Sequence, residues 1–265
     1  MGLALDTVLY DVHNAATTAI GLTTALLANS GDPAQIRSFN DPAYSRMLSL
    51  FAQSSGAQQV RVTSPRMHDN VTGLTFQSAE IPAEFLLPPE VAEPMFSVDT
   101  LSVSAAAAAS SDTVVAPLIF YSDLAGIAAN LQTWAQVKAR FIRLKVMAVA
   151  VTSSATPGTW VDTVITTTEN QLKADYEYAL LGFQPSASLA MIGLKGPATG
   201  NLRVCIPGNT ETLDLTSYFI WMSDRHNLPL IPVFKANDRG ATFVSCASNA
   251  ASVAASVQAV LAQLS

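Results

Sequence analysis

Charged residues are scarce in this chain of 265 residues. Asp, Glu, Lys and Arg together make up 13% of it, about half of the ~25% that is usual for soluble globular domains. The apolar share, 49%, is ordinary. Because charged side chains normally keep a protein surface in contact with water, Ser, Thr, Asn and Gln must do so here, or much of the surface is covered. Neighbouring subunits or a membrane would each explain this composition.

Long apolar runs are also missing. A membrane-spanning helix needs about 20 mostly apolar residues, and the two charge-free windows, 14–31 and 240–265, are both interrupted by Asn, Ser, Thr or Gln. Asp6 and Asp11 stand where a secretion signal would carry basic residues. The sequence therefore predicts no transmembrane segment and no secretion signal.

Basic residues and cysteines are too few for several classes of function. The net charge is −6, and with no Lys/Arg cluster we expect no strong direct nucleic-acid binding. Cys205 and Cys246 make neither a disulfide framework nor a metal site. Both lie in apolar, strand-like surroundings, which predicts buried thiols in a reducing compartment.

Motifs for catalysis are absent as well. The chain has no GxSxG elbow, no P-loop and no GxGxxG fingerprint, and the glycine-rich residues 193–201 are typical of a turn between two strands. The pairs Asp175/Glu177 and Asp224/His226 are the features that could support an enzyme, although an exposed strand face explains the first pair more simply. We expect no enzyme, and predict no catalytic, cofactor-binding or metal-binding residue. The two remaining histidines are His13 and His68. The scattered tryptophans, Trp134, Trp160 and Trp221, are expected in the core or at an interface.

Helical spacing marks the beginning of the chain. Apolar residues recur at Val8, Val12, Ala15 and Ala19, which predicts a helix over 3–29. Asp41 and Pro42 are a typical helix start, and a second helix is predicted from there to about Gly56. Residues 1–56 are therefore expected to form a helical arm, and one more helix is predicted over 125–141.

Short strands are predicted along the rest of the chain. Alternation with period two marks residues 59–63 and 73–77, and an extended connector without regular structure is expected over 81–94. Further strands are expected at 97–104, 113–121, 142–152, 160–167, 175–183, 188–194, 202–206, 215–222, 230–234 and 241–246, the first two as neighbours. The tail after Asn249 fits either a helix or a strand. Many short strands without regular strand–helix alternation favour a sandwich.

The fold class predicted is thus mainly β with helical additions, a jelly-roll-like β-sandwich with an N-terminal helical arm. Its domains would be the arm, 1–56, and a β-rich shell domain, 57–265. No internal repeat is visible in the sequence, so one jelly roll, two jelly rolls or another fold all stay open.

Four segments resemble a known class of proteins: SPRMHDNVTGL (64–74), DYEYALLGF (175–183), GPATGNLRVCIPG (196–208) and YFIWMSDRHNLPLIPVFKANDRGATF (218–243). Together they resemble virion structural proteins of bacterial and archaeal viruses, of the coat or capsid kind. The resemblance implies a shell-forming subunit with no cofactor and no catalytic residues.

The function predicted is a self-assembling coat protein of a viral capsid-type shell, located in the virion and made in the host cytoplasm. Its main partner would be itself, with other virion proteins as further partners. The alternative is a β-sandwich module for host attachment or carbohydrate binding. The contact surfaces expected are the arm and the charge-free segment from Gly240, with polar contacts from the loops around Arg66 and Arg225.

Overall fold

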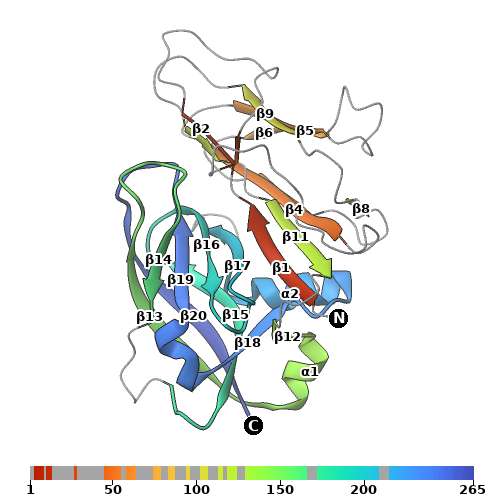
Figure 1. Ribbon diagram of the computed structural model, residues 1–265, viewed down its shortest axis with the longest axis vertical. Coiled ribbons are helices and arrows are strands. Elements are labelled where there is room, and N and C mark those ends of the chain that lie inside the picture. The colour runs from red at the N-terminus through yellow and green to blue at the C-terminus, as the bar shows by residue number, and fades with distance from the viewer. Residues whose placement is uncertain are drawn as a thin grey trace.

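Strands dominate the structure, a computed structural model (Figure 1). It describes residues 129–165, 172–208 and 215–265; before residue 129 it describes the strands, and of their side chains Leu5 and Arg61. The described helices are short: α1 (Trp134–Ala139), α2 (Tyr218–His226) and the 3₁₀ helices η3 (Leu215–Ser217) and η4 (Ala236–Ala241).

The strands of the N-terminal half are β1 (Leu3–Val8), β2 (Tyr10–His13), β3 (Leu27–Ala28), β4 (Ser45–Ser54), β5 (Gln58–Thr63), β6 (Leu74–Ser78), β7 (Ala83–Leu86), β8 (Pro94–Met95), β9 (Ser102–Ala106), β10 (Thr113–Val115) and β11 (Leu118–Asp123). Those of the C-terminal half are β12 (Leu131–Gln132), β13 (Phe141–Thr152), β14 (Val161–Val164), β15 (Glu177–Pro185), β16 (Leu189–Lys195), β17 (Arg203–Gly208), β18 (Ile231–Lys235), β19 (Phe243–Ala247) and β20 (Ala254–Leu264).

The C-terminal half is a jelly roll. Its five-stranded sheet has the order β12-β18-β15-β20-β13, and its four-stranded sheet the order β14-β19-β16-β17, with all pairs antiparallel. Counting β13 as the first strand and β20 as the eighth, one sheet joins the first, eighth, third and sixth strands, and the other joins the second, seventh, fourth and fifth. This order is the double Greek key of a jelly-roll sandwich, and the predicted β-sandwich class is confirmed.

The N-terminal half follows the same strand order. Its larger sheet joins β1 to β11, β11 to β4 and β4 to β7, which are the first, eighth, third and sixth strands of a roll. Its three-stranded sheet, β6-β5-β9, joins the fifth, fourth and seventh. Between β2 and β4 the structure describes only β3, which pairs with β2, so the second strand has no counterpart among the described residues. The chain therefore repeats one topology, although no repeat is visible in its sequence.

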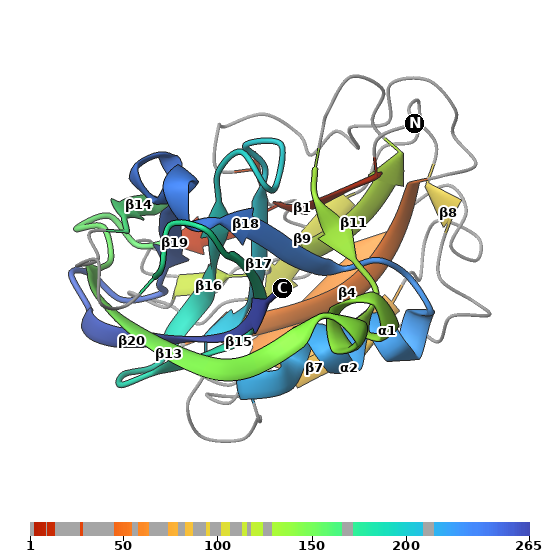
Figure 2. The ribbon, with the colours of Figure 1, turned by 90° about the horizontal axis from the view of Figure 1, so that it is seen from below.

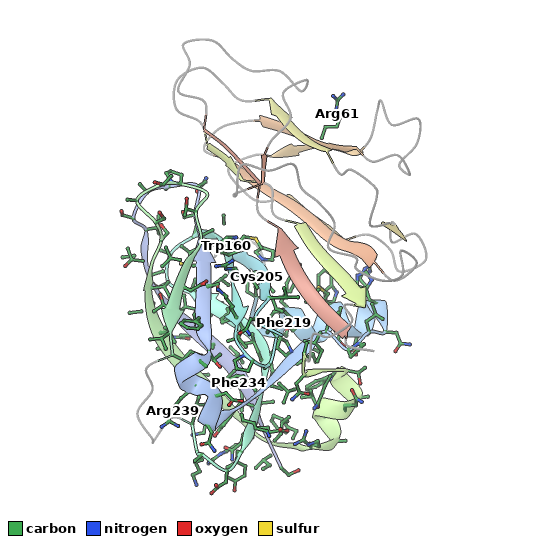
Figure 3. The ribbon with its side chains drawn as sticks, in the orientation of Figure 1. Arg61, Trp160, Cys205, Phe219, Phe234 and Arg239 are labelled. Carbon is green, nitrogen blue, oxygen red and sulfur yellow. The ribbon has the colours of Figure 1, made fainter. Side chains whose placement is uncertain are left out.

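The core of the C-terminal half lies between its two sheets. On β13 the side chains of Met147, Val149 and Val151 alternate inward, as β-branched and long apolar residues do on a half-buried strand. The rings of Tyr178 and Phe234 are tilted against each other with their centroids 6.1 Å apart, and both are buried. Figure 3 labels Phe219 and Phe234 in this half of the molecule, far from Arg61.

Two helical segments cover part of the outer face of the five-stranded sheet. There η3 and α2 pack on β15, and a Cβ at Gly182 would collide with the backbone of Leu215 and Thr216. The apolar side chains that α2 buries, among them Phe219 and Met222, recur at helical spacing. Figure 2 shows β13 and β18 apart, as expected for two strands that β20 and β15 separate in this sheet.

The helices predicted over 3–29 and from 41 to 56 are wrong wherever the structure describes the chain, because it places β1 to β4 there. The apolar residues of LALDTV fit a period of two as well as a helical period, and six residues of β1 pair with β11. Long-range pairing therefore overrides the local helical spacing. Strands on both sides of residue 56 share one sheet, and the rest of the expected arm lies outside the described residues.

Other predicted elements were wrong in type, length or pairing. Of the helix predicted over 125–141, the described residues from 129 on form the six residues of α1, because Leu131 and Gln132 pair with β18 and a Thr133–Gln136 capping box starts the helix after them. The strand over 215–222 is η3 and α2. The strands at 97–104 and 113–121 are not neighbours, since β9 pairs with β5 and β10 with β2 and β4. The connector over 81–94 contains β7, which pairs with β4.

The remaining predicted strands of the C-terminal half are confirmed as β13 to β19 without the 215–222 segment, and the ambiguous tail forms β20. Within β20, exposed and buried residues alternate from Ala254 to Gln258, after which the strand is buried through Leu264. The charge-free C-terminal segment thus contains β19 and β20, and β20 lies between β13 and β15.

Candidate functional site

The two residue pairs that could have supported catalysis are not assembled into an acid–base site. Glu177 begins β15 and forms an ion pair with Arg140 at 2.7 Å, whereas Asp175 lies before the strand and is exposed. Asp224 is exposed on α2, and His226 is buried at the end of the same helix. Among the described residues, no group of three or more His, Cys, Asp or Glu side chains could hold a metal ion.

The two cysteines are buried, as predicted. Cys205 lies on β17 and Cys246 on β19; both are fully buried, and no disulfide joins them. Burial raises the pKa of the Cys246 thiol to about 11, with a further contribution from the charge of Asp162. A thiol that stays protonated at neutral pH is a poor nucleophile, so Cys246 has the chemistry of a small apolar core residue.

A polar cluster on the four-stranded sheet is the most highly connected group of side chains in the described part of the chain. Asp162 on β14 accepts hydrogen bonds from Lys195 Nζ at 2.8 Å, from Arg203 at 3.1 and 2.8 Å, and from Ser245 Oγ at 2.6 Å. The guanidinium of Arg203 lies 5.4 Å from the ring centre of Trp160. Sequence reasoning missed this cluster, because its members are far apart in the chain and meet only across β14, β19, β16 and β17.

The electrostatics of this cluster identify it as structural. Burial alone would raise the pKa of Asp162, but the hydrogen bonds from Arg203, Lys195 and Ser245 outweigh it and lower the pKa to about 2. A carboxylate that stays ionised and shares its oxygens among three donors cannot serve as a proton donor or acceptor near neutral pH. The cluster instead ties together all four strands of the sheet.

A surface with the features of an interface lies on β13. This strand pairs with β20 on one side, and none of the described strands pairs with its other edge. Phe141, Ile142, Leu144 and Val146 are 45–54% exposed. Ile142, Leu144 and Val146 alternate along the strand, so they project from the outer face of the sheet. We call these three residues the β13 row.

An apolar row on an open edge strand makes an isolated protein prone to unwanted association with other chains. Such an edge offers unpaired backbone N–H and C=O groups to any passing strand, and natural proteins usually protect it with charge, proline or a covering segment. Exposed apolar patches commonly mark contact sites with other proteins or with membranes. The sequence predicted the strand, but not that it would lie at an edge, because strand order depends on pairings distant in sequence.

Basic side chains gather at the start of the same strand. Lys138, Arg140, Arg143 and Lys145 are four of the 14 basic residues of the chain, so the expectation of no Lys/Arg cluster is wrong at this place. Arg140 is bound to Glu177 and to the Ser265 carbonyl, and Arg143 donates to Gln263 Oε1 at 2.8 Å. Lys138 is exposed and Lys145 half-buried.

The other predicted contact regions are placed only in part. Arg225 lies exposed on α2, and the loop around Arg66 and His68 lies outside the described residues. Trp221 is 45% exposed and has an edge-on contact with Tyr218, while Trp134 and Trp160 are partly buried against the core. None of the helices in the described part of the chain is long and apolar enough to cross a membrane.

Comparisons with known proteins do not assign a family. No family model matches the sequence, and no curated protein matches it. Among solved structures, the T=1 Penaeus vannamei nodavirus structure is similar at TM-score 0.26 and 10% identity, covering 99% of this chain and 98% of that one. The PBSX exported protein XepA is similar at TM-score 0.25 and 8% identity, covering 96% and 85%.

Viral and non-viral proteins both occur among these structures. The Sulfolobus turreted icosahedral virus structure is similar at TM-score 0.23 and 9% identity, covering 100% of this chain and 80% of that one. YhaK from Escherichia coli is similar at TM-score 0.25 and 10% identity, covering 97% and 86%. Likenesses this low carry no argument about fold or function, and the jelly-roll assignment stands on the strand order alone.

Proposed function

We propose that this chain is a self-assembling structural coat protein that forms a viral capsid-type shell. It would act as a virion component made in the host cytoplasm, with copies of itself as its main partners and other virion proteins as further partners. The observation that carries the proposal is the β13 row, an apolar surface on an open edge strand of a jelly roll in a chain with few charges.

Composition and topology support the same proposal. Interfaces between stable subunits are apolar and depleted in charge at their centres, which is how the outer faces of β13 and β20 are composed. Jelly rolls are common in viral capsids, although they also occur in lectins and cupins, so the fold by itself does not decide the function. The alternative, a carbohydrate-binding or host-attachment module, would need an exposed aromatic platform, and of the three tryptophans only Trp221 is largely exposed.

The test is the particle mass of the purified full-length protein. Light scattering after size-exclusion chromatography, with negative-stain imaging of the same fractions, should show closed megadalton shells or ordered sheets at some combination of salt and protein concentration. A monomer or small oligomer under every condition would contradict the proposal.

A further inference from the structure

The outer surface formed by β13 and β20 is free of charge over its whole length. On β13 the row continues through Ala148 and Ala150, and the register places Val260, Gln258 and Ser256 of β20 beside it. No acidic or basic side chain stands on this face between Ile142 and Thr152. A surface of this composition matches the centre of a protein–protein interface, where charge is depleted.

Charge is divided unequally between the two halves of the chain. Residues 1–128 hold 12 acidic and 4 basic residues, a net charge of −8, whereas residues 129–265 hold 8 acidic and 10 basic residues, a net charge of +2. Lys138 and Arg140 precede the β13 row, whereas Arg143 and Lys145 alternate with it and therefore lie on the other face of the strand. No acidic residue occurs between 124 and 161. The segment that carries the β13 row is therefore complementary in net charge to the N-terminal half.

Within one chain, the N-terminal half lies at the other side of the sandwich. Its first strand, β1, contacts β17, the fifth strand of the C-terminal roll, and Leu5 of β1 is fully buried in the same core cluster. Because β17 and β13 stand at opposite margins of their sheets, this contact leaves β13 uncovered, as Figure 1 shows.

The repeated topology indicates which surface would match. The contact inside the chain joins the first strand of one roll, β1, to the fifth strand of the other, β17. The equivalent pair with the rolls exchanged is β13 and β6, which one chain cannot bring together while β1 occupies the β17 side. Two copies can form this pair head to tail, and a head-to-tail contact closes into rings when the rotation allows it.

We propose that the β13 row docks on the N-terminal half of a second copy of this chain, on the side of its strand β6. The apolar row supplies the water-excluding centre of the contact, and the neighbouring Lys138 faces the acidic half of the partner copy at its rim. This proposal rests on the proposed function, because it names the contact through which the shell would grow.

The experiment compares three variants with the wild type: Leu144→Glu, Leu144→Lys and Trp221→Glu. Leu144 is 54% exposed and Trp221 45%, so each change should leave the fold intact, which circular dichroism and thermal unfolding of the dissociated protein check. Leu144→Glu should lower the assembled fraction at least about tenfold, because it places an acid against an acidic partner surface. Leu144→Lys should be clearly less harmful, and Trp221→Glu, the matched control away from β13, should assemble like the wild type.

Zero-length carbodiimide cross-linking of assemblies made from mixed ¹⁴N and ¹⁵N protein identifies the partner surface directly. Mixed-isotope cross-links from Lys138 to carboxylates within residues 1–128 are expected. Covalent dimers of an oxidised Val146→Cys variant would show that β13 pairs with its own copy, and would overturn the proposal.

The two proposals fail in different ways. If the wild type forms shells and Leu144→Glu assembles equally well, the β13 contact is wrong and the coat function stands. If Leu144→Glu and Leu144→Lys lower the assembled fraction equally, the partner surface is not acidic and that part of the proposal is wrong. A wild type that never assembles would overturn both proposals.

Discussion

Replacing Asp162 by Asn tests whether the polar cluster holds the four-stranded sheet together. The Asp162 carboxylate receives hydrogen bonds from Lys195, Arg203 and Ser245, and its side chain is only 21% exposed. With an amide in its place, two cations would share a partly buried site without a counter-charge. Breaking a fully buried ion pair in this way costs about 3–5 kcal/mol. Because Lys195 and Arg203 keep about 30% exposure, we expect a loss of about 2–3 kcal/mol in the free energy of unfolding.

The pH dependence gives this prediction a second readout. The pKa of Asp162 falls from 3.8 to about 2 on folding, which corresponds to about 2.4 kcal/mol, or about 1–2 kcal/mol after allowance for solvent screening. Because the folded-state pKa is lowered, this stability is present in full above the unfolded pKa and is lost as the pH falls through about 2. The stability gap between wild type and Asp162→Asn should therefore narrow from about pH 4 to pH 2.

Urea unfolding of the dissociated subunit, followed by tryptophan fluorescence, measures both effects. Glu177→Gln is the matched control, since it breaks the single and more exposed ion pair with Arg140 and should cost at most about 1 kcal/mol. A loss for Asp162→Asn no larger than for this control, or a gap that stays constant between pH 5 and pH 2, would refute the structural role assigned to the cluster.

Three further predictions concern packing. Gly182→Ala should destabilise the protein by at least about 2 kcal/mol, because the new methyl group would displace η3 from β15. A loss of about 1 kcal/mol usually lowers the thermal unfolding temperature by about 2–4 °C. An unfolding temperature within about 2 °C of the wild type would therefore contradict this prediction. Leu5→Ala should lower the free energy of unfolding by about 2–5 kcal/mol, because Leu5 is fully buried in the core cluster. For the same reason, removing the first 30 residues should damage the fold as well as assembly. Chemical denaturation of the two proteins checks this, and a fully stable truncated chain would show that β1 is dispensable. Cys205 and Cys246 should resist a maleimide at pH 7 and react fully in denaturant, as read by mass spectrometry; labelling of the native protein would mean that β17 or β19 opens.

The sequence allowed the strands of the C-terminal half to be predicted well, because alternation and turn residues are local signals. Residues such as Met147, Val149 and Val151 mark β13 without any knowledge of its neighbours. The same signals failed near the beginning of the chain, where the apolar residues of 3–29 fit a helical period as well as a period of two. Pairing with β11 decided between them, and a pairing across more than 100 residues leaves no trace in local spacing.

The candidate site could not be predicted for the same reason. That Phe141–Thr152 is a strand follows from its composition, whereas its place at the edge of a sheet follows from the order of five strands. Likewise, Asp162 and Arg203 gave no motif, because their contact exists only once β14, β19, β16 and β17 lie side by side. The sequence did show that charged residues are scarce, but it did not show which part of the surface lacks them.

The structure shows which surface lacks charged side chains. In the C-terminal half, Asp162, Lys195 and Arg203 are engaged with one another on one sheet, and four further basic residues are gathered between 138 and 145. The outer face of β13 and β20 is left without charge, at an open edge of the jelly roll. An isolated subunit would gain solubility from a single lysine in the middle of this row, at no cost to its core, since these side chains point away from it. A row kept apolar where folding does not require it favours a binding role, and this is the physical basis for our proposal that β13 is an assembly surface.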